Sequence, residues 1–244
     1  MPDSFIPTDL ASISTLLAAA GGLGTAAYGL VDASKAVAGG MSNPGFGFIK
    51  NAVRPLLGDP GSGATAFGAD QVLATLRANW LNGVAKADQK AVAKSLIRLN
   101  LTSGNAGQLA AATGVDQQGL IAAAQSVQNG TAPTQRDINI LGQFDAIVSA
   151  ILDLGYERAD QMYRNTAKAV AALVAIFLAA IGGGLIFYSG AASASPPSLG
   201  GYLSSRLFLL SIVIGAMSTP LAPVAKDISS SLQAAVKAVS AARR

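Results

Sequence analysis

Three stretches of this chain are hydrophobic and contain no ionisable side chain apart from tyrosine: Leu10–Val31, Ala169–Gly190 and Leu207–Ala225. A helix of about 20 apolar residues crosses the roughly 30 Å hydrocarbon core of a bilayer. Helices on the surface of soluble proteins carry polar residues on the face exposed to water. The pattern therefore predicts three transmembrane helices, over 10–33, 169–190 and 207–225.

A long amphipathic pattern leads into the second of these stretches. Thr134 and Asp137 have the spacing of a helix-capping pair. Apolar residues then recur at alternating steps of four and three, the period at which packed helices meet. They are Ile140, Phe144, Ile147, Ile151 and Leu154, and Leu141, Val148 and Leu152 widen the same face. We expect one helix over 133–168 that packs through this seam and continues into the second span.

Between the first span and this helix, Gly and Pro break up a connector over 34–69, and four short helical patterns follow it. The patterns cover Asp70–Leu81, Ala85–Leu99, Ala106–Thr113 and Asp116–Gln128. No sustained alternation of apolar and polar residues predicts a strand. The expected fold is an all-α integral membrane protein. Its predicted parts are an external N-terminus (1–9), a first span (10–33), the connector (34–69), a cytoplasmic small-helix domain (70–132), an amphipathic juxtamembrane helix (133–168), a second span (169–190), an external loop (191–206), a third span (207–225) and a cytoplasmic amphipathic tail (226–244).

Composition supports this class and narrows the chemistry. Of the 244 residues 51% are hydrophobic and 12% are charged, against about 25% charged in ordinary soluble domains. The chain has no cysteine and no histidine, so it lacks the commonest general base and the commonest metal ligands. We expect a protein that is not an enzyme, with no catalytic residues, no cofactor and no metal site.

The placement of basic residues predicts an orientation. The first nine residues carry two Asp and no Lys or Arg, residues 34–168 carry twelve Lys and Arg, and the loop 191–205 carries no charge. Basic residues beside spans stay in the cytoplasm. The N-terminus is therefore predicted outside, 34–168 inside and the C-terminus inside.

The first span has two alternatives. A cleaved signal peptide begins with a basic region and has a shorter apolar core, whereas this stretch follows an acidic start, so an uncleaved span fits better. The small residues over Ala18–Gly24 leave a buried helix open as the second alternative.

Two motifs resemble nucleotide or DNA sites but lack the necessary charge. Gly58–Thr65 has the glycines of a phosphate-binding loop, but Ala64 stands where the lysine would be. The residues Gln108-Leu109-Ala110, Gly114-Val115-Asp116 and Leu120-Ile121 resemble a bacterial helix-turn-helix. Residues 99–135 contain no Lys or Arg, and binding to duplex DNA requires several. We expect neither nucleotide nor nucleic acid as a partner.

One row of charge is a candidate surface. Four basic residues recur at four-residue steps: Lys86, Lys90, Lys94 and Arg98. Such a row on a cytoplasmic helix is either an ordinary solvated face or a contact for anionic lipid or an acidic partner. Small residues at four-residue spacing mark the spans and predict close helix packing, within the chain or between copies. They are Ala18, Gly22 and Ala26; Ala180 and Gly184; and Ser211, Gly215 and Thr219.

The run Gly155-Tyr156-Glu157-Arg158 through Tyr163-Arg164 feeds a span, a second span follows, and then a short amphipathic tail. Over roughly residues 140–240 this arrangement resembles uncharacterised bacterial multi-pass membrane proteins. The resemblance implies a location in the bacterial inner membrane and no activity.

We therefore expect a non-enzymatic structural protein in contact with membrane lipid, which forms a homo-oligomer or assembles with other membrane subunits. The alternative is a pore or transporter subunit lined between copies by polar residues such as Thr25, Tyr28, Ser211 and Ser218.

Overall fold

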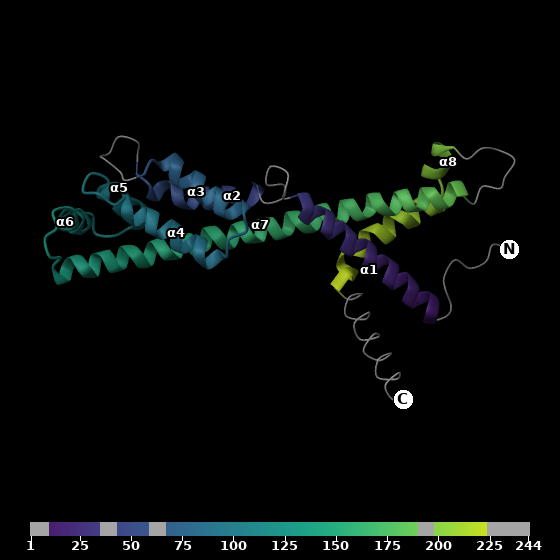
Figure 1. Cartoon of the computed structure of the whole chain (residues 1–244), viewed down its shortest axis with the longest axis horizontal. Coiled ribbons are helices and arrows are strands. Elements are labelled where there is room, and N and C mark those ends of the chain that lie inside the picture. The colour runs from purple at the N-terminus through teal and green to yellow at the C-terminus, as the bar shows by residue number, and fades with distance from the viewer. Residues whose placement is uncertain (1–9, 35–42, 59–66, 190–197, 224–244) are drawn as a thin grey trace, which may run out of the picture. The chain divides into compact units, whose positions relative to one another are not determined.

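The computed structural model describes residues 10–34, 43–58, 67–189 and 198–223. All regular elements in these ranges are helical, as the sequence predicts (Figure 1). They are α1 (Leu10–Ala33), α2 (Asn43–Val53), the short 3-10 helix η3 (Arg54–Leu56), α3 (Ala69–Leu81), α4 (Lys86–Leu99), α5 (Ala106–Thr113), α6 (Gln117–Gln128), α7 (Gln135–Ser189), α8 (Leu199–Leu203) and a last helix, Arg206–Pro223.

The chain divides into two compact units. Unit 1 comprises Met1–Val37 and Asn165–Arg244, and unit 2 comprises Ala38–Arg164. Helix α7 is 55 residues long and contributes to both. The predicted N-terminus 1–9 and tail 226–244 lie outside the described residues.

Two helices in the described ranges are long and apolar enough to cross a membrane, α7 and Arg206–Pro223. These two helices are candidate membrane spans and suggest membrane association. Helix α1 has 24 residues, and its crossing of a membrane remains a prediction.

Unit 2 is built around the first part of α7. Helices α2 and α4 both pack against α7, where Gly155 of α7 lies beside Ala52 of α2 and Tyr156 of α7 reaches Gln89 of α4. The core combines residues of α2, η3, α3, α4, α5, α6 and α7. Its largest fully buried side chains are Tyr156, Phe144, Ile49, Leu56, Leu76, Ile97, Leu109, Leu120 and Leu152.

The buried face of α7 is rotated relative to the predicted seam. Ile140 and Phe144 are buried, and Ile147 and Ile151 are partly buried, but Leu154 is 53% exposed. Val148 and Leu152 of the widened face are buried, and beyond them the core face passes through Tyr156 and Ala159 instead of Leu154. The prediction is corrected here because helices lie on both sides of this face, and residues spaced four apart face them better than the narrow seam of a two-helix coil.

The connector is more regular than expected. Its described part contains α2, with Pro44 in the first turn, where a missing N–H does no harm. Gly45 is buried against α7. A Cβ at this position would lie 2.7 Å from the Ala159 carbonyl oxygen. Gly45 therefore permits close packing of α2 against α7, and neither glycine of α2 breaks the helix.

The predicted capping pair begins α7. The Asp137 carboxylate accepts hydrogen bonds from the Thr134 backbone N–H and hydroxyl, both at 2.8 Å, and the Asp137 N–H donates back to the Thr134 hydroxyl. These hydrogen bonds lower the pKa of Asp137 because they stabilise its charged form.

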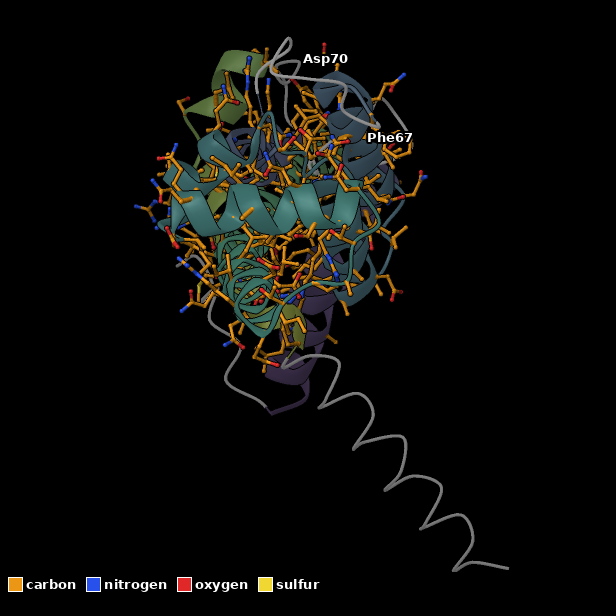
Figure 2. The ribbon with its side chains drawn as sticks, turned by 90° about the vertical axis from the view of Figure 1, so that its left-hand side faces the viewer. Phe67 and Asp70 are labelled. Carbon is orange, nitrogen blue, oxygen red and sulfur yellow. The ribbon has the colours of Figure 1, made fainter. Side chains whose placement is uncertain are left out.

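A second polar anchor joins α4 to the start of α3. The Asn100 side chain accepts from the Phe67 N–H at 3.0 Å and donates to the Phe67 carbonyl at 2.9 Å. Asn105 donates to the Asn100 carbonyl at 2.6 Å, and both asparagines are fully buried. Figure 2 marks Phe67 and the nearby Asp70 at this end of α3. The anchor fixes the C-terminal end of α4.

Candidate membrane surface and ion-pair ladder

Unit 1 has small residues where its helices meet. A Cβ on Gly24 of α1 would overlap the Ser218 carbonyl of helix 206–223 and lie 3.0 Å from Ala222 Cβ. A Cβ on Gly215 would lie 2.5 Å from Ile176 Cα in α7. Glycine at these two positions therefore lets the helix backbones approach closely, as small residues do in membrane helix bundles.

The large apolar side chains of unit 1 lie on its outside. On α7, Leu173, Phe177 and Leu185 are 65–68% exposed, whereas Ala171 and Ala175 are fully buried. On helix 206–223 the exposed large residues include Leu209, Val213 and Met217. Within unit 1 this reverses the usual order, because a soluble core buries its largest apolar side chains. Exposed apolar side chains of this size are typical of surfaces that contact lipid or another protein.

The sequence-predicted small residues are placed unevenly. Ala180 and Gly184 of α7 lie beside Tyr202, whose hydroxyl donates to the Ala180 carbonyl at 2.5 Å and whose ring would be 3.5 Å from a Cβ on Gly184. Ser211 lies against Gly183, and Gly215 lies against Ile176. These residues meet at helix contacts within unit 1.

Within unit 1 the row of small residues predicted on α1 does not lie at a helix contact, and its packing between copies remains a prediction. Ala18 and Ala26 are exposed, and no heavy atom comes within 4 Å of a Cβ built on Gly22. The buried row of α1 is Ala20, Gly24, Ala27 and Val31. Several rows of small residues occur on this glycine- and alanine-rich helix, so spacing alone did not identify the one that packs.

Two buried serines of unit 1 are satisfied by their own helix. Ser211 donates to the Leu207 carbonyl at 2.8 Å and Ser218 to the Gly215 carbonyl at 2.7 Å. Both serines are buried, whereas Thr25 is exposed and Tyr28 is partly buried. The four residues of the pore alternative thus do not share one environment.

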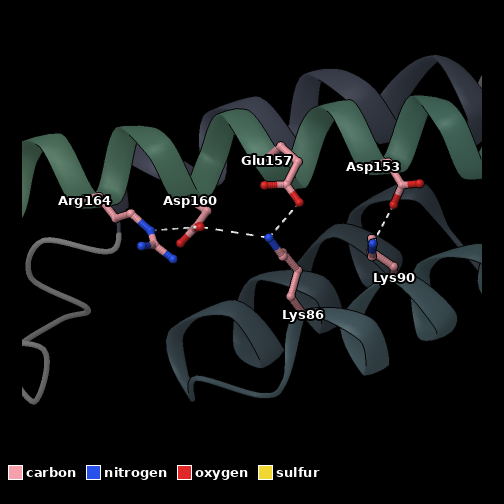
Figure 3. A network of polar contacts seen from close by, with 6 residues as sticks. All are labelled: Lys86, Lys90, Asp153, Glu157, Asp160 and Arg164. Carbon is pink, nitrogen blue, oxygen red and sulfur yellow. Dashed lines mark hydrogen bonds and ion pairs between the residues drawn. The ribbon is translucent and has the colours of Figure 1, made fainter.

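Unit 2 carries a ladder of ion pairs between α4 and α7. Lys86 Nζ lies 2.7 Å from Glu157 Oε1 and 3.9 Å from Asp160 Oδ2, and Lys90 Nζ lies 2.5 Å from Asp153 Oδ1 (Figure 3). Farther along α4, Lys94 Nζ is 2.7 Å and Arg98 Nε is 3.8 Å from Asp145. Arg164 also pairs with Asp160, at 3.0 Å. We call these contacts, without Arg164, the ion-pair ladder.

The ladder follows from antiparallel packing of the two helices. Each step of four residues forward along α4 corresponds to a step back along α7, from Glu157 to Asp153 and on to Asp145. At the intermediate step α7 has Ser149, so Lys94 pairs with Asp145 instead. Four cations therefore meet four carboxylates.

The ion-pair ladder lies at the exposed edge of the contact between α4 and α7. A buried layer with incomplete hydrogen bonding lies beneath it. The paired side chains are 27–65% exposed, so each pair contributes at most about 1 kcal/mol. Below them the Tyr156 hydroxyl donates to the Gln89 carbonyl over a long 3.4 Å, and Gln89 Oε1 has no hydrogen-bond partner among the described residues. Burial raises the pKa of Tyr156 to about 12.

The ladder gives the predicted basic row an acidic partner within the chain. Spacing along one helix indicates only a solvated face for Asp145, Asp153, Glu157 and Asp160, and does not predict their pairing with the basic row. The complementary spacing of four on the two helices was the signal available. Contact of the row with lipid or another protein remains a prediction.

The remaining motifs offer no ligand site within the described residues. The glycine-rich loop 58–65 lies outside them apart from Gly58. The pair α5 and α6 forms with Gly114 at φ 73° between them, and Asp116 pairs with Arg136 at 3.1 Å. Over the ranges that the structure describes, no group of three or more His, Cys, Asp or Glu could hold a metal ion.

No protein-family model, curated protein or solved structure matches the chain.

Proposed function

We propose that the protein is a non-enzymatic structural component of a membrane that assembles with itself or with other membrane subunits. The observation that carries this proposal is the arrangement of unit 1, in which small residues occupy the helix contacts and Leu, Phe, Val and Met cover the exterior. Lipid tails are as apolar as these side chains, so this exterior costs nothing in a bilayer but would drive aggregation in water.

The proposed topology has three spans in the bacterial inner membrane, with α1 as the first, the N-terminus outside and unit 2 in the cytoplasm. Its support is the twelve Lys and Arg of residues 34–168, against none in 1–9 and 191–205. Assembly is supported by the helix surface of α1 that carries Ala18, Gly22 and Ala26, which no described residue of unit 1 covers. The pore alternative has less support, because Ser211 and Ser218 are buried and hydrogen-bonded within their own helix.

Membrane embedding and assembly are tested separately. Full-length protein expressed in bacteria should sediment with membranes, resist alkaline carbonate and require detergent for extraction. Native mass measurement in mild detergent should then give a complex heavier than the 24.4 kDa chain with its bound detergent. A protein that stays in solution without detergent would overturn the membrane proposal, and a lone monomer would overturn assembly.

Sidedness can be measured on single-cysteine variants because the chain has no native cysteine. Ser95→Cys lies on the exposed side of α4, and Ser204→Cys lies in the segment predicted outside. A membrane-impermeant maleimide added to intact spheroplasts should label the second variant and not the first. The opposite result would invert the topology.

A further inference from the structure

The basic row of α4 is matched by the acidic side of α7. Lys86, Lys90, Lys94 and Arg98 bring four positive charges, and Asp145, Asp153, Glu157 and Asp160 bring four negative ones. Another polyanion can take the row only by replacing these carboxylates. The strength with which α7 holds α4 therefore decides whether the row is available.

The charged part of this hold is open to competition. The side chains of Glu157 and Asp153 are 61% and 57% exposed, and those of the three lysines are 30–37% exposed. Pairs between exposed side chains are individually weak and are screened by salt. Arriving anions can approach the lysines without first opening the core.

The layer beneath the ladder is only partly satisfied by hydrogen bonds. Gln89, Ala93 and Ile97 are the buried residues of α4. Val92 and Leu96 are partly buried against the core. The buried Gln89 Oε1 has no partner among the described residues, and the Tyr156 hydroxyl reaches the Gln89 carbonyl only at 3.4 Å. Opening at this end would let water satisfy the orphaned oxygen, which reduces the cost of separation.

The two ends of α4 differ in their attachment. The C-terminal end is fixed by the buried hydrogen bonds of Asn100 with Phe67 and Asn105. The N-terminal end, with Lys86, follows a turn at Gly83, whose φ is 68°. Asp160, a partner of Lys86, precedes the charge-free run at Ala169 by nine residues, or about 14 Å of helix rise. The N-terminal end of α4 is thus the one whose ion-pair partners lie nearer in sequence to the candidate span.

We propose that the basic row of α4 is a binding surface for anionic phospholipid headgroups and that the acidic side of α7 closes it, so that an anionic membrane and α7 compete for the same four cations. The inference rests on the proposed membrane embedding, which holds unit 2 next to a bilayer. Anionic lipid attracts juxtamembrane basic residues. The fold thereby makes lipid binding depend on the anionic content of the membrane.

The test measures the separation of α4 and α7 in full-length protein reconstituted into nanodiscs. Spin labels are placed on Ala91→Cys in α4 and Ala150→Cys in α7, two exposed, uncharged positions in a chain with no other cysteine. In phosphatidylcholine nanodiscs we expect a single short distance. In nanodiscs rich in phosphatidylglycerol we expect a second population, longer by about one helix diameter, roughly 10 Å.

Variants assign the effect to the row. Lys86→Gln combined with Lys90→Gln and Lys94→Gln should abolish the dependence of the long population on phosphatidylglycerol. Asp153→Asn combined with Glu157→Gln should produce the long population at a lower content of anionic lipid. The matched control is Lys50→Gln with Arg54→Gln, two exposed cations of α2 and η3 outside the ladder, and it should respond like the parent. If the triple variant does not fold, the acidic-side pair still tests the competition.

Each contrary outcome overturns the proposal. Protein that inserts but shows the same distance in both lipids overturns it and leaves membrane embedding intact, whereas failure to insert overturns both. A control variant that loses the response as fully as the triple variant shows a general charge effect. Opening by added polyglutamate but not by anionic lipid assigns the row to an acidic protein instead.

Discussion

Gly155 of α7 lies so close to α2 that a Cβ at this position would be 2.6 Å from Ala52 Cβ. The same Cβ would also be 3.5 Å from the Phe48 carbonyl oxygen, so the backbone of α2 lies directly over this glycine. Gly155 is therefore needed for the contact between α2 and α7.

Gly155→Ala should destabilise unit 2 by about 1–3 kcal/mol, because the added methyl overpacks the contact by more than the gain of about 1 kcal/mol in helix propensity. Gly142→Ala on the same helix is the control, since nothing lies within 4 Å of a Cβ there, and it should be neutral or stabilising. Thermal unfolding followed by circular dichroism in detergent measures both. Equal melting temperatures would contradict the packing.

Gly215→Ala should lower the stability of unit 1 in the same way. The new Cβ would lie 2.5 Å from Ile176 Cα and 2.9 Å from the Ala175 carbonyl, both backbone atoms that cannot move alone. The expected loss is of the order of 1–3 kcal/mol. The fraction of protein that stays monodisperse after heating in detergent reports the change. Gly182→Ala on α7, with nothing within 4 Å, should behave like the parent, and a similar loss in both would argue against this contact.

The Lys90–Asp153 pair should show a small, salt-dependent coupling. Single variants Lys90→Gln and Asp153→Asn and their double variant form a cycle whose coupling energy we expect at about 0.2–1 kcal/mol, because both side chains are partly exposed. The coupling should shrink as sodium chloride is added. Chemical denaturation at two salt concentrations measures it. A coupling unaffected by salt would mean that the pair is not screened by solvent.

The free energy of unfolding of unit 2 should fall as the pH rises above 10, because Tyr156 is buried in its neutral form. Its pKa is about 12 in the folded protein, against 10.0 for a tyrosine exposed to water, so above pH 10 the unfolded chain releases the proton while the folded chain keeps it. The stabilisation is complete below pH 10 and is lost as the pH rises towards 12, a change of up to roughly 2–3 kcal/mol.

Tyr156→Phe isolates this effect, because other groups that titrate in the same range are common to both proteins. At neutral pH the variant should lose less than about 1 kcal/mol, since the hydrogen bond to Gln89 is long. Between pH 10 and 12 its stability should fall less than that of the parent. Parallel curves would refute the assignment.

The short helices of unit 2 could be placed from sequence because their ends carry local signals. The predicted patterns and the observed helices differ by at most one residue at each end. Gly83, Gly114 and Gly130, with φ between 66° and 73°, stand just after three of these helices, where only a residue tolerant of positive φ ends a helix without strain.

The contacts between helices far apart in sequence could not be placed in this way. Helix α2 was assigned to a connector because its glycines lower helix propensity, yet Gly45 is required by contact with Ala159, 114 residues away. The same applies to Leu154, which satisfies the seam period but is exposed. Which face of a helix is buried depends on where its neighbours lie, and spacing along one helix does not contain that information.

Among the described residues, the hydrophobic core of unit 2 is drawn from its own stretch of chain, since the buried residues of that core lie between Ile49 and Ala159. A polypeptide of residues 38–164 should therefore fold autonomously and be obtainable without lipid or detergent. Its solution spectra and crystals would then be accessible by the routine methods used for small cytosolic domains.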